Sequence, residues 1–475
     1  MLWLYLHFPQ LLLDHINRSR QEVTPLAIIT GAQPQVIQAC LAARQQGVQP
    51  GMPLKTAFNL APDLAMVRMD EDQQTRILEQ QAHWLYRYLD RITLYPPDGL
   101  LAEVSSVQKL YRGLENTLSL LTEALQQHQL SAHPAMGLTP FAARLTARTG
   151  HGICSADTGE LERAVAALPL SAAEFDPRTL QRLTRLGLTR LREVFDLPAT
   201  ELARRLTPEV LAHVQRIQGR RPDPQVTWQP PHHFRQRADF AQDIEQAQSL
   251  LFALKRILGE LENDLRWRQQ DTDSLLLVLH HRHHEATRLR LRTTGPEHRA
   301  DAFMNLLRIR FEQQPLVAPV YQLELVVKRF LSRQPDQHQD LLEQGGSPQE
   351  AWNTLISRLQ ARLGEQALSQ LSPRADHRPE RAWSADRLQA QHNNALPAAS
   401  DRQLTPPRPL WLLSKPQPLT VTPGVWLAGP ERICGGWWDG QKVQRDYYTA
   451  QLPSGQLAWV FRDVREGWFI HGWFG

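Results

Sequence analysis

A single acidic side chain stands where the sequence could support metal-dependent chemistry. The strand-like stretch 94–104 reads LYPPDGLLAEV, and Asp98 is followed directly by Gly99 instead of a second carboxylate. Two-metal catalysis needs several carboxylates to hold two cations about 3.5 to 4 Å apart. One carboxylate cannot hold such a pair. We therefore predict that Asp98 is a strand-end or loop residue with its own partners and is not a catalyst.

Two other acids, Asp14 and Glu103, lie near this stretch in the sequence. Strand alternation sets the face to which Glu103 points, and Asp14 lies on a helix that follows Pro9. Neither side chain is therefore expected to point toward Asp98. If they did converge, the site would be complete and the chain would be an active enzyme. That alternative stays open at this point.

A second chemical signal is a row of arginines. Leu289 and Leu291 alternate with three arginines, which puts three guanidinium groups on one strand face above an apolar face; the arginines are Arg288, Arg290 and Arg292. Such a row can bind the phosphate backbone of a nucleic-acid duplex. The affinity then depends on the salt concentration but not on the base sequence. The alternative is a solvated outer face of a sheet.

The elements that must position these residues fall into distinct segments. Residues 1–165 alternate short apolar runs with helical patterns, as an α+β or α/β domain does. Leucines at helical spacing fill 176–220, with Gly187 at a helix end. Residues 232–330 again predict α+β structure, and 333–408 has the composition of a linker with one helix.

The tail, residues 409–475, predicts a small all-β module with an aromatic core. Glycine and proline turns separate its many tryptophans, which are Trp411, Trp426, Trp437, Trp438, Trp459, Trp468 and Trp473. Core packing explains most of them, so only an exposed minority is expected to anchor an interface.

Composition limits the class of protein. The 475 residues are too many for one core, and 42% hydrophobic with 21% charged residues predicts folded, soluble domains. The net charge of +4 permits a polyanionic partner without requiring one. The three cysteines are far apart in the sequence and form no CxxC pair, which favours a reducing cytoplasm and argues against a structural zinc site. The histidines of 280–284 lack partner ligands at a recognisable spacing, so they do not predict a metal site. The apolar N-terminus breaks at Pro9 and predicts a buried strand, not a signal peptide.

Residues 35–67 resemble the fingers region of Y-family, lesion-bypass DNA polymerases. The shared features are an Ala-Arg pair, then Gly-Val, Gly-Met-Pro and a Pro-x-Leu strand, in that order. The segment MGLTPFAARLTA, residues 136–147, resembles a palm segment of the same family. The tail resembles one non-catalytic branch of that family, found in bacterial mutagenesis cassettes.

This resemblance implies a multidomain α+β fold with Y-family polymerase-like palm, fingers, thumb and little finger, then a linker and a small Trp-rich β-containing module. The implied domains are a palm at 1–165 with fingers inserted at about 21–75, a helical thumb with a helix-hairpin-helix-like segment at 166–228, a little finger at 232–332, a linker at 333–408 and the C-terminal module at 409–475.

Alignment by motif places the metal-binding acids of the family on degenerate positions. The first Asp falls on His7, the next acidic position falls on Pro9, and the Asp-Glu pair falls on Asp98 and Gly99. Histidine prefers softer cations than magnesium, and glycine supplies no ligand. The resemblance therefore implies no catalytic residues, no bound metal and no cofactor.

Two further positions are carried over from the family. Its nucleotide-contacting Tyr-x-x-Arg reads Leu41 and Arg44 here, so Arg44 is a candidate phosphate ligand, with a solvated surface arginine as the alternative. The Leu-Gly-Leu turn at Gly187 resembles a helix-hairpin-helix that meets a DNA phosphate, although the usual Gly-x-Gly opening is absent.

A short peptide in the linker resembles ligands of the bacterial sliding clamp. The segment DQHQDLLEQ matches the end of that pattern at Asp340, Leu341 and Leu342, with either His338 or Gln337 at its glutamine position. Plain linker is the alternative.

The non-catalytic branch implies an adaptor in DNA damage tolerance, translesion synthesis and SOS mutagenesis. The implied partners are DNA, the sliding clamp (β subunit), an error-prone DnaE-type polymerase and a small RecA-related protein, in the cytoplasm and without a membrane. The alternatives are an active Y-family polymerase that uses divalent metal and dNTP, and a simple DNA-binding protein, which would leave the fingers match unexplained.

Overall fold

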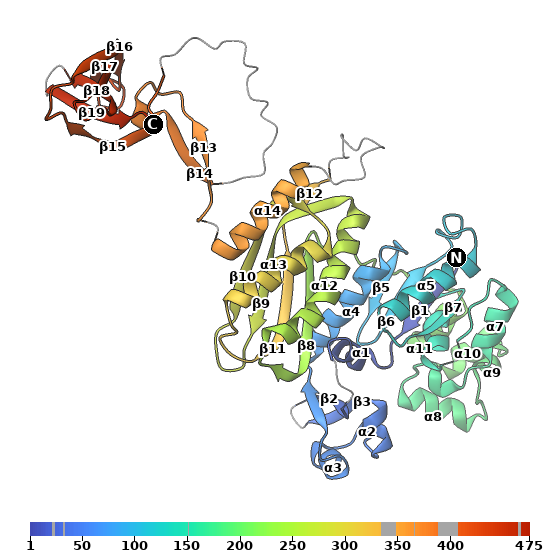
Figure 1. Ribbon diagram of the computed structural model, residues 1–475. Helices are drawn as coiled ribbons and strands as arrows, with labels where there is room; N and C mark the ends of the chain where they lie inside the picture. The colour runs from blue at the N-terminus through green and yellow to red at the C-terminus, as the bar shows by residue number, and fades with distance from the viewer. Residues whose placement is uncertain are drawn as a thin grey trace. The chain divides into compact units, whose positions relative to one another are not determined.

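The computed structural model describes two compact units, Met1–Gln344 and Gly345–Gly475, each with its own core (Figure 1). The described residues are 1–20, 24–31, 34–150, 152–333, 348–364, 366–387, 407–463 and 467–475. None of the helices in these ranges is both long enough and apolar enough to cross a membrane.

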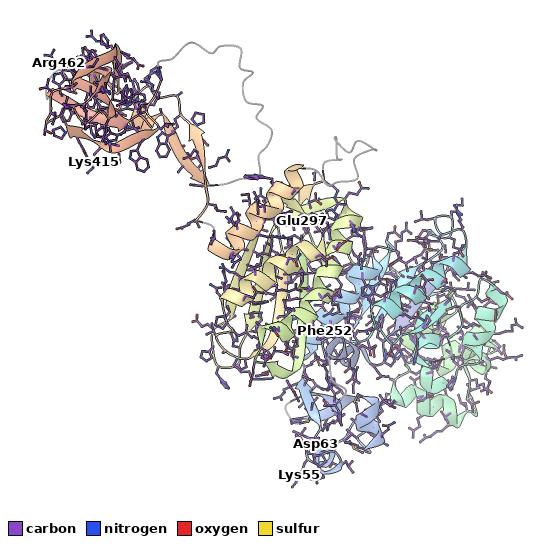
Figure 2. All side chains as sticks on the ribbon, viewed as in Figure 1. Lys55, Asp63, Phe252, Glu297, Lys415 and Arg462 are labelled. Carbon is purple, nitrogen blue, oxygen red and sulfur yellow. The ribbon has the colours of Figure 1, made fainter. Side chains whose placement is uncertain are left out.

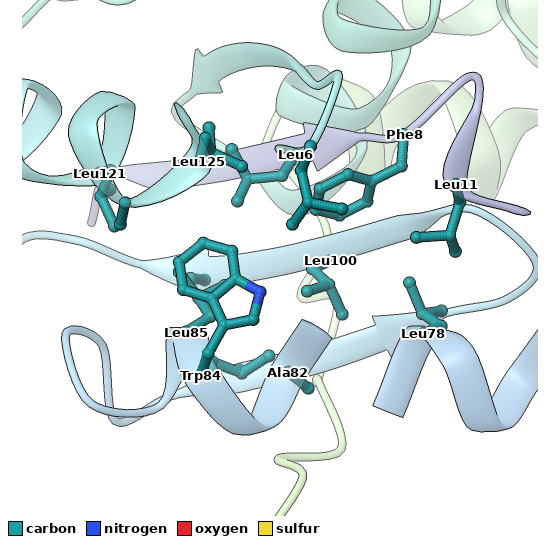
Figure 3. Close-up of a cluster of buried hydrophobic side chains, with 14 of the residues drawn as sticks. Leu6, Phe8, Leu11, Leu78, Ala82, Trp84, Leu85, Leu100, Leu121 and Leu125 are labelled. Atoms are coloured by element: carbon teal, nitrogen blue, oxygen red, sulfur yellow. The ribbon is translucent and has the colours of Figure 1, made fainter. Parts of the chain in front are cut away.

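The first unit begins with an antiparallel sheet in the strand order β5–β6–β1–β7. Its strands are β1 (Trp3–His7), β5 (Ile92–Tyr95), β6 (Gly99–Glu103) and β7 (His133–Gly137). Leu6 and Leu100 point to one face, where they meet Trp84 and Leu121 from the covering helices (Figure 3). Those helices are α1 (Leu11–Asn17), α4 (Glu71–Leu85) and α5 (Leu114–Gln127).

Helix α6 (Pro140–Arg148) covers the opposite face of this sheet. Thr139 begins the helix by accepting a hydrogen bond from the backbone N–H of Ala142, and Pro140 fits the first helical turn. Tyr5 and Leu101 from the sheet pack with Ala143 of this helix. Arg148, the last residue of α6, lies near the end of the sheet where β1 stops and β6 starts.

A small separate core is inserted between α1 and α4. Its sheet has the order β3–β2–β4, with β2 (Leu26–Thr30), β3 (Gln35–Ala39) and β4 (Ala65–Arg68). Two short helices, α2 (Leu41–Gln45) and α3 (Leu54–Leu60), complete it. Lys55 on α3 and Asp63 in the following turn lie at its far end (Figure 2).

A helical region follows α6. It contains α7 (Thr158–Ala166), α8 (Pro177–Arg185), α9 (Leu191–Phe195), α10 (Ala199–Arg205), α11 (Pro208–Ile217) and the 3-10 turn η1 (Leu170–Ala172). Asp176 begins α8 by accepting hydrogen bonds from the backbone N–H groups of Arg178 and Thr179, each 3.0 Å long. Short capped helices of this kind pack through scattered leucines such as Leu183 and Leu191.

The last part of the first unit is a sheet in the order β10–β9–β11–β8 with two helices on one face (Figure 1). Its elements are β8 (Phe234–Ile244), α12 (Ala247–Arg268), β9 (Gln270–His280), β10 (Thr287–Glu297), α13 (Ala300–Gln313), β11 (Val320–Val327) and β12 (Leu331–Ser332). Glu297 ends β10 and accepts a 2.9 Å hydrogen bond from the backbone N–H of Arg299, just before α13, and Phe252 is a partly exposed side chain on α12 (Figure 2).

The second unit holds α14 (Pro348–Leu363) and a sheet in the order β15–β19–β18–β17–β16. The strands are β15 (Trp411–Pro418), β16 (Val425–Gly435), β17 (Val443–Gln451), β18 (Leu457–Asp463) and β19 (Gly467–Trp473). Tyr447 and Trp459 stack with ring centroids 4.0 Å apart in the core of this module.

The expectation that 333–408 is a linker with one helix needs a correction. Besides α14, this segment contains the hairpin of β13 (Ser369–Pro373) and β14 (Trp383–Arg387), with the 3-10 turn η2 (Pro379–Arg381) between the strands. Buried Arg378 binds Asp376 and, 61 residues away, Asp439, each at 2.7 Å. Composition suggested a linker because these charges look solvated until their distant partners are known.

Candidate functional site

The ends of four strands bring the degenerate positions together. Across the sheet, Tyr95 pairs with Gly99, Gly99 with His7, and His7 with His133. The Nε2 atom of His7 lies 3.5 Å from Oδ2 of Asp98. His7, Asp98 and Gly99 thus form one local site, as the motif alignment had placed them.

The space above Gly99 is filled by Tyr5. A Cβ atom added to Gly99 would lie 1.7 Å from the Oη atom and 2.3 Å from Cζ of Tyr5. Tyr5 is fully buried, its hydroxyl has no hydrogen-bond partner among the described residues, and burial raises its pKa. A carboxylate side chain at position 99 therefore cannot fit unless the Tyr5 ring moves.

Asp98 already faces one cation of the protein, the Arg148 guanidinium. Nη1 of Arg148 lies 3.5 Å from Oδ1 of Asp98, and Nε of Arg148 lies 3.9 Å from Glu174. Glu174 also binds Nη2 of Arg144 at 3.0 Å. The two arginines on α6 and the two carboxylates balance in charge, so the group is a closed set of ion pairs.

Asp14 and Glu103 are held elsewhere. Asp14 accepts a 2.7 Å hydrogen bond from the backbone N–H of Ser131, and its burial raises its pKa. Glu103 accepts a 2.8 Å hydrogen bond from the backbone N–H of Ser105. Within the described ranges, no group of three or more His, Cys, Asp and Glu side chains has an arrangement that could hold a metal ion.

The arginine row on β10 lies on the sheet face opposite the helices. Its members are exposed and stand in register with Val278, Leu276 and Ser274 of β9, whereas Leu291 of β10 is buried on the other face; they are Arg288, Arg290 and Arg292. On the same face of β8, Arg235 and Arg237 both bind Glu324. This face therefore presents guanidinium groups at both edges of the sheet.

Gly187 lies in the turn between α8 and α9 with φ of +79°. The backbone N–H of Leu188 donates to Leu183 at 3.2 Å, so the turn closes the end of α8 with the glycine in the left-handed region. No atom lies within 4 Å of the position where a Cβ would be. The glycine is thus required by the backbone, and its surroundings are open.

A basic face on α8 escaped the sequence analysis. Three exposed arginines follow each other at helical spacing on its outer side, and they are Arg178, Arg182 and Arg185. Residues four and three apart share a helix face, so the spacing in PRTLQRLTR was the available signal.

The remaining predicted residues are placed as follows. Arg44 is exposed, and its Nε donates a 2.8 Å hydrogen bond to the carbonyl oxygen of Ala39. In the histidine run, His281 is buried and bonds to Pro319 and Thr287. The clamp-like residues Asp340, Leu341 and Leu342 lie outside the described residues.

Known proteins to which this chain is similar are of the Y-family DNA polymerase-like class. Residues 14–148 match the family model described as impB/mucB/samB family. Along most of its length the chain is similar to the curated protein named Protein ImuB. The ImuB of Caulobacter vibrioides strain NA1000 / CB15N and that of strain ATCC 19089 / CIP 103742 / CB 15 are each 26% identical over 472 residues, covering 90% of this chain and 100% of the relative.

These matches confirm the predicted resemblance to ImuB and the predicted Y-family polymerase-like fold class. They support a role in DNA damage tolerance. Among solved structures, the insertion ternary complex of Dbh DNA polymerase is 15% identical, with a TM-score of 0.40, and the match covers 70% of this chain and 99% of that one. DinB from Sulfolobus solfataricus is 16% identical with a TM-score of 0.38, over 70% and 100% of the two chains.

Proposed function

We propose that this chain is a non-catalytic adaptor that acts in DNA damage tolerance and induced mutagenesis in the cytoplasm. The observation that carries the proposal is the filled space above Gly99, where the Tyr5 hydroxyl lies 1.7 Å from the position of a Cβ atom. A second acidic ligand at position 99 would require the Tyr5 ring to move, and Arg148 already faces Asp98. Two-metal nucleotidyl transfer lacks its ligands under these conditions.

The adaptor holds DNA through its exposed guanidinium groups. The rows on β10 and α8 are spaced along a strand and a helix, so successive side chains reach successive phosphates of one backbone. Gly187 opens the turn next to the α8 row and lets backbone amides approach a phosphate. Arg44 is a further candidate phosphate ligand, in its case for a nucleotide.

The adaptor also recruits proteins to that DNA. Asp340, Leu341 and Leu342 supply the peptide for the sliding clamp, whose groove takes an extended segment with an apolar end. The C-terminal module supplies exposed aromatic anchors for an error-prone DnaE-type polymerase and an ImuA-like, RecA-related protein. Its exposed side chains include Trp411, Trp426, Trp437 and Trp438.

Co-purification on primed, clamp-loaded DNA tests this function. The full chain should increase the amount of a DnaE-type polymerase retained on the DNA, while it incorporates no nucleotide itself. Retention that is the same with and without the chain would contradict the recruiting role.

The second candidate function is an active Y-family translesion polymerase with divalent metal and dNTP. It is favoured only by the retention of Asp98 at the strand end, and it requires Asp14 or Glu103 to turn toward that residue. Both are buried and hydrogen-bonded to Ser131 and Ser105. Breaking those contacts would cost about 1 to 3 kcal/mol for each buried group left unpaired.

A further inference from the structure

The ion pairs around Asp98 continue out of the sheet and into the helical region. Arg148 on α6 contacts Asp98 at 3.5 Å and Glu174 at 3.9 Å, so it joins the end of the sheet to the segment that leads into α8. Arg144, one turn earlier on α6, holds the same Glu174 carboxylate at 3.0 Å. The segment between η1 and α8, inside the helical region, is thus tied to the degenerate site.

Glu174 has an unusual backbone conformation. Its φ is +56°, in the left-handed region that side chains other than glycine seldom occupy. Such a conformation persists where the surroundings determine it. Here the two arginines of α6 bind the Glu174 side chain, and the neighbouring Ala173 accepts a 2.8 Å hydrogen bond from Nε2 of His213 on α11.

The segment that leaves the helical region is tied to the same place. Oη of Tyr95 donates a 2.7 Å hydrogen bond to the side-chain oxygen of Gln225, and Gln225 in turn donates to Asp223 at 2.8 Å. Arg144 lies over the Tyr95 ring, with Cζ 4.9 Å from its centroid. Arg144 therefore contacts both the carboxylate of Glu174, just before α8, and the ring of Tyr95, which binds the segment after α11.

We infer that Asp98, Arg144, Arg148 and Tyr95 form an anchor that sets the direction of the helical region relative to the sheet. Asp98 is then a positioning residue that orients Arg148, a role that requires no metal ion. The consequence for DNA rests on the proposed function: a fixed direction holds the arginine row of α8 in a constant orientation toward a duplex that the β10 row binds.

The charges of the anchor favour this role over binding of a free anion. Arg144 and Arg148 face Glu174 and Asp98, so both arginines already have carboxylate partners. An incoming phosphate would have to displace a carboxylate from each arginine. The same groups, left in place, link two chain segments that are far apart in the sequence.

The test measures the distance between two spin labels in the full-length chain. The labels are attached at Leu110, an exposed residue of the sheet domain, and at exposed Gln181 on α8, after the native cysteines have been replaced. The variants are Glu174→Gln and Asp98→Asn, which keep side-chain volume but remove the charge. The control is Arg192→Ala, which breaks an exposed ion pair with Asp196 within the helical region.

We expect both variants, but not the control, to broaden the distance distribution at an unchanged helix content by circular dichroism. Duplex affinity should fall with the populated fraction of the anchored state, about tenfold if that fraction falls to one tenth. A distribution in both variants that matches the control would overturn the anchor. The measurement needs neither nucleotide nor metal, so it stands even if polymerase activity is found.

Discussion

At the scale of single residues, side chains from separate elements meet at the end of the sheet. The motif alignment placed His7, Asp98 and Gly99 together because the ends of neighbouring strands meet. It did not predict Tyr5 above Gly99 or Arg148 beside Asp98. These contacts join residues of different elements, 50 positions apart for Arg148 and Asp98, and they depend on packing that a single sequence does not reveal. Tyr5 and Arg148 decide whether the site beside Asp98 has room and charge for a metal ion.

Gly99→Ala should destabilise the protein. The new Cβ would overlap Tyr5 in a closed core, and overpacking of this kind costs about 1 to 3 kcal/mol. Gly259→Ala on α12 is the matched control, since nothing lies within 4 Å of its Cβ position and alanine favours a helix by about 0.8 to 1 kcal/mol. Denaturant unfolding of both variants checks the difference; equal stability of the two would contradict the filled site.

A half-buried histidine should make stability depend on pH. Burial lowers the pKa of His128, which stacks on Trp84, to about 4, compared with about 6.5 in the unfolded chain. Between these values the unfolded state takes up a proton that the native state refuses, so stability is full above pH 6.5 and falls as the pH drops toward 4. His128→Gln should reduce this loss, measured as the free energy of unfolding at pH 7 and pH 4.5. A variant with the same pH dependence as the wild type would contradict the shift.

At the scale of elements, periodicity predicted most of the strands and helices around the arginine row. Alternation of leucine and arginine placed β10, and the observed register with β9 puts the three guanidinium groups on the face opposite the helices. The hairpin of β13 and β14 could not be predicted in the same way. Its short strands carry mixed polar residues, and its attachment depends on Arg378 reaching an aspartate 61 residues away.

Changing the β10 row to glutamate should weaken DNA binding and lower its salt dependence. Each lost phosphate contact reduces the slope of log K against log salt by about 0.9. The variant combines Arg288→Glu, Arg290→Glu and Arg292→Glu. A control with the same change in net charge on the covering helices combines Lys255→Glu, Arg266→Glu and Arg308→Glu. The affinity for a labelled duplex is measured by fluorescence anisotropy between 50 and 200 mM salt. Equal affinity and equal salt dependence in the two variants would contradict the assignment of the β10 row to DNA binding.

At the scale of the whole molecule, the chain combines a polymerase-like unit with a second unit whose surface is rich in tryptophan. The two units have separate cores, so changes in one are not expected to unfold the other. Recognition of the fold came from the order of short motifs in the first 150 residues, which the family match at 14–148 confirms. Partner surfaces are harder to predict, because exposed and buried tryptophans look identical in a sequence.

The clamp peptide can be tested in the intact chain. Leu341→Ala combined with Leu342→Ala should reduce retention on immobilised sliding clamp at least tenfold, because the apolar end of such a peptide fills the groove pocket. Leu410→Ala, an exposed leucine in the C-terminal module, is the control. Undiminished retention of the double variant would dismiss the peptide.

Primer extension by the purified full-length chain, with magnesium or manganese and all four nucleotides, tests the central claim most directly. We predict no incorporation above that of an Asp98→Ala variant purified in the same way. Incorporation by the wild-type chain that disappears in Asp98→Ala would show that the carboxylate still binds catalytic metal and would contradict the account.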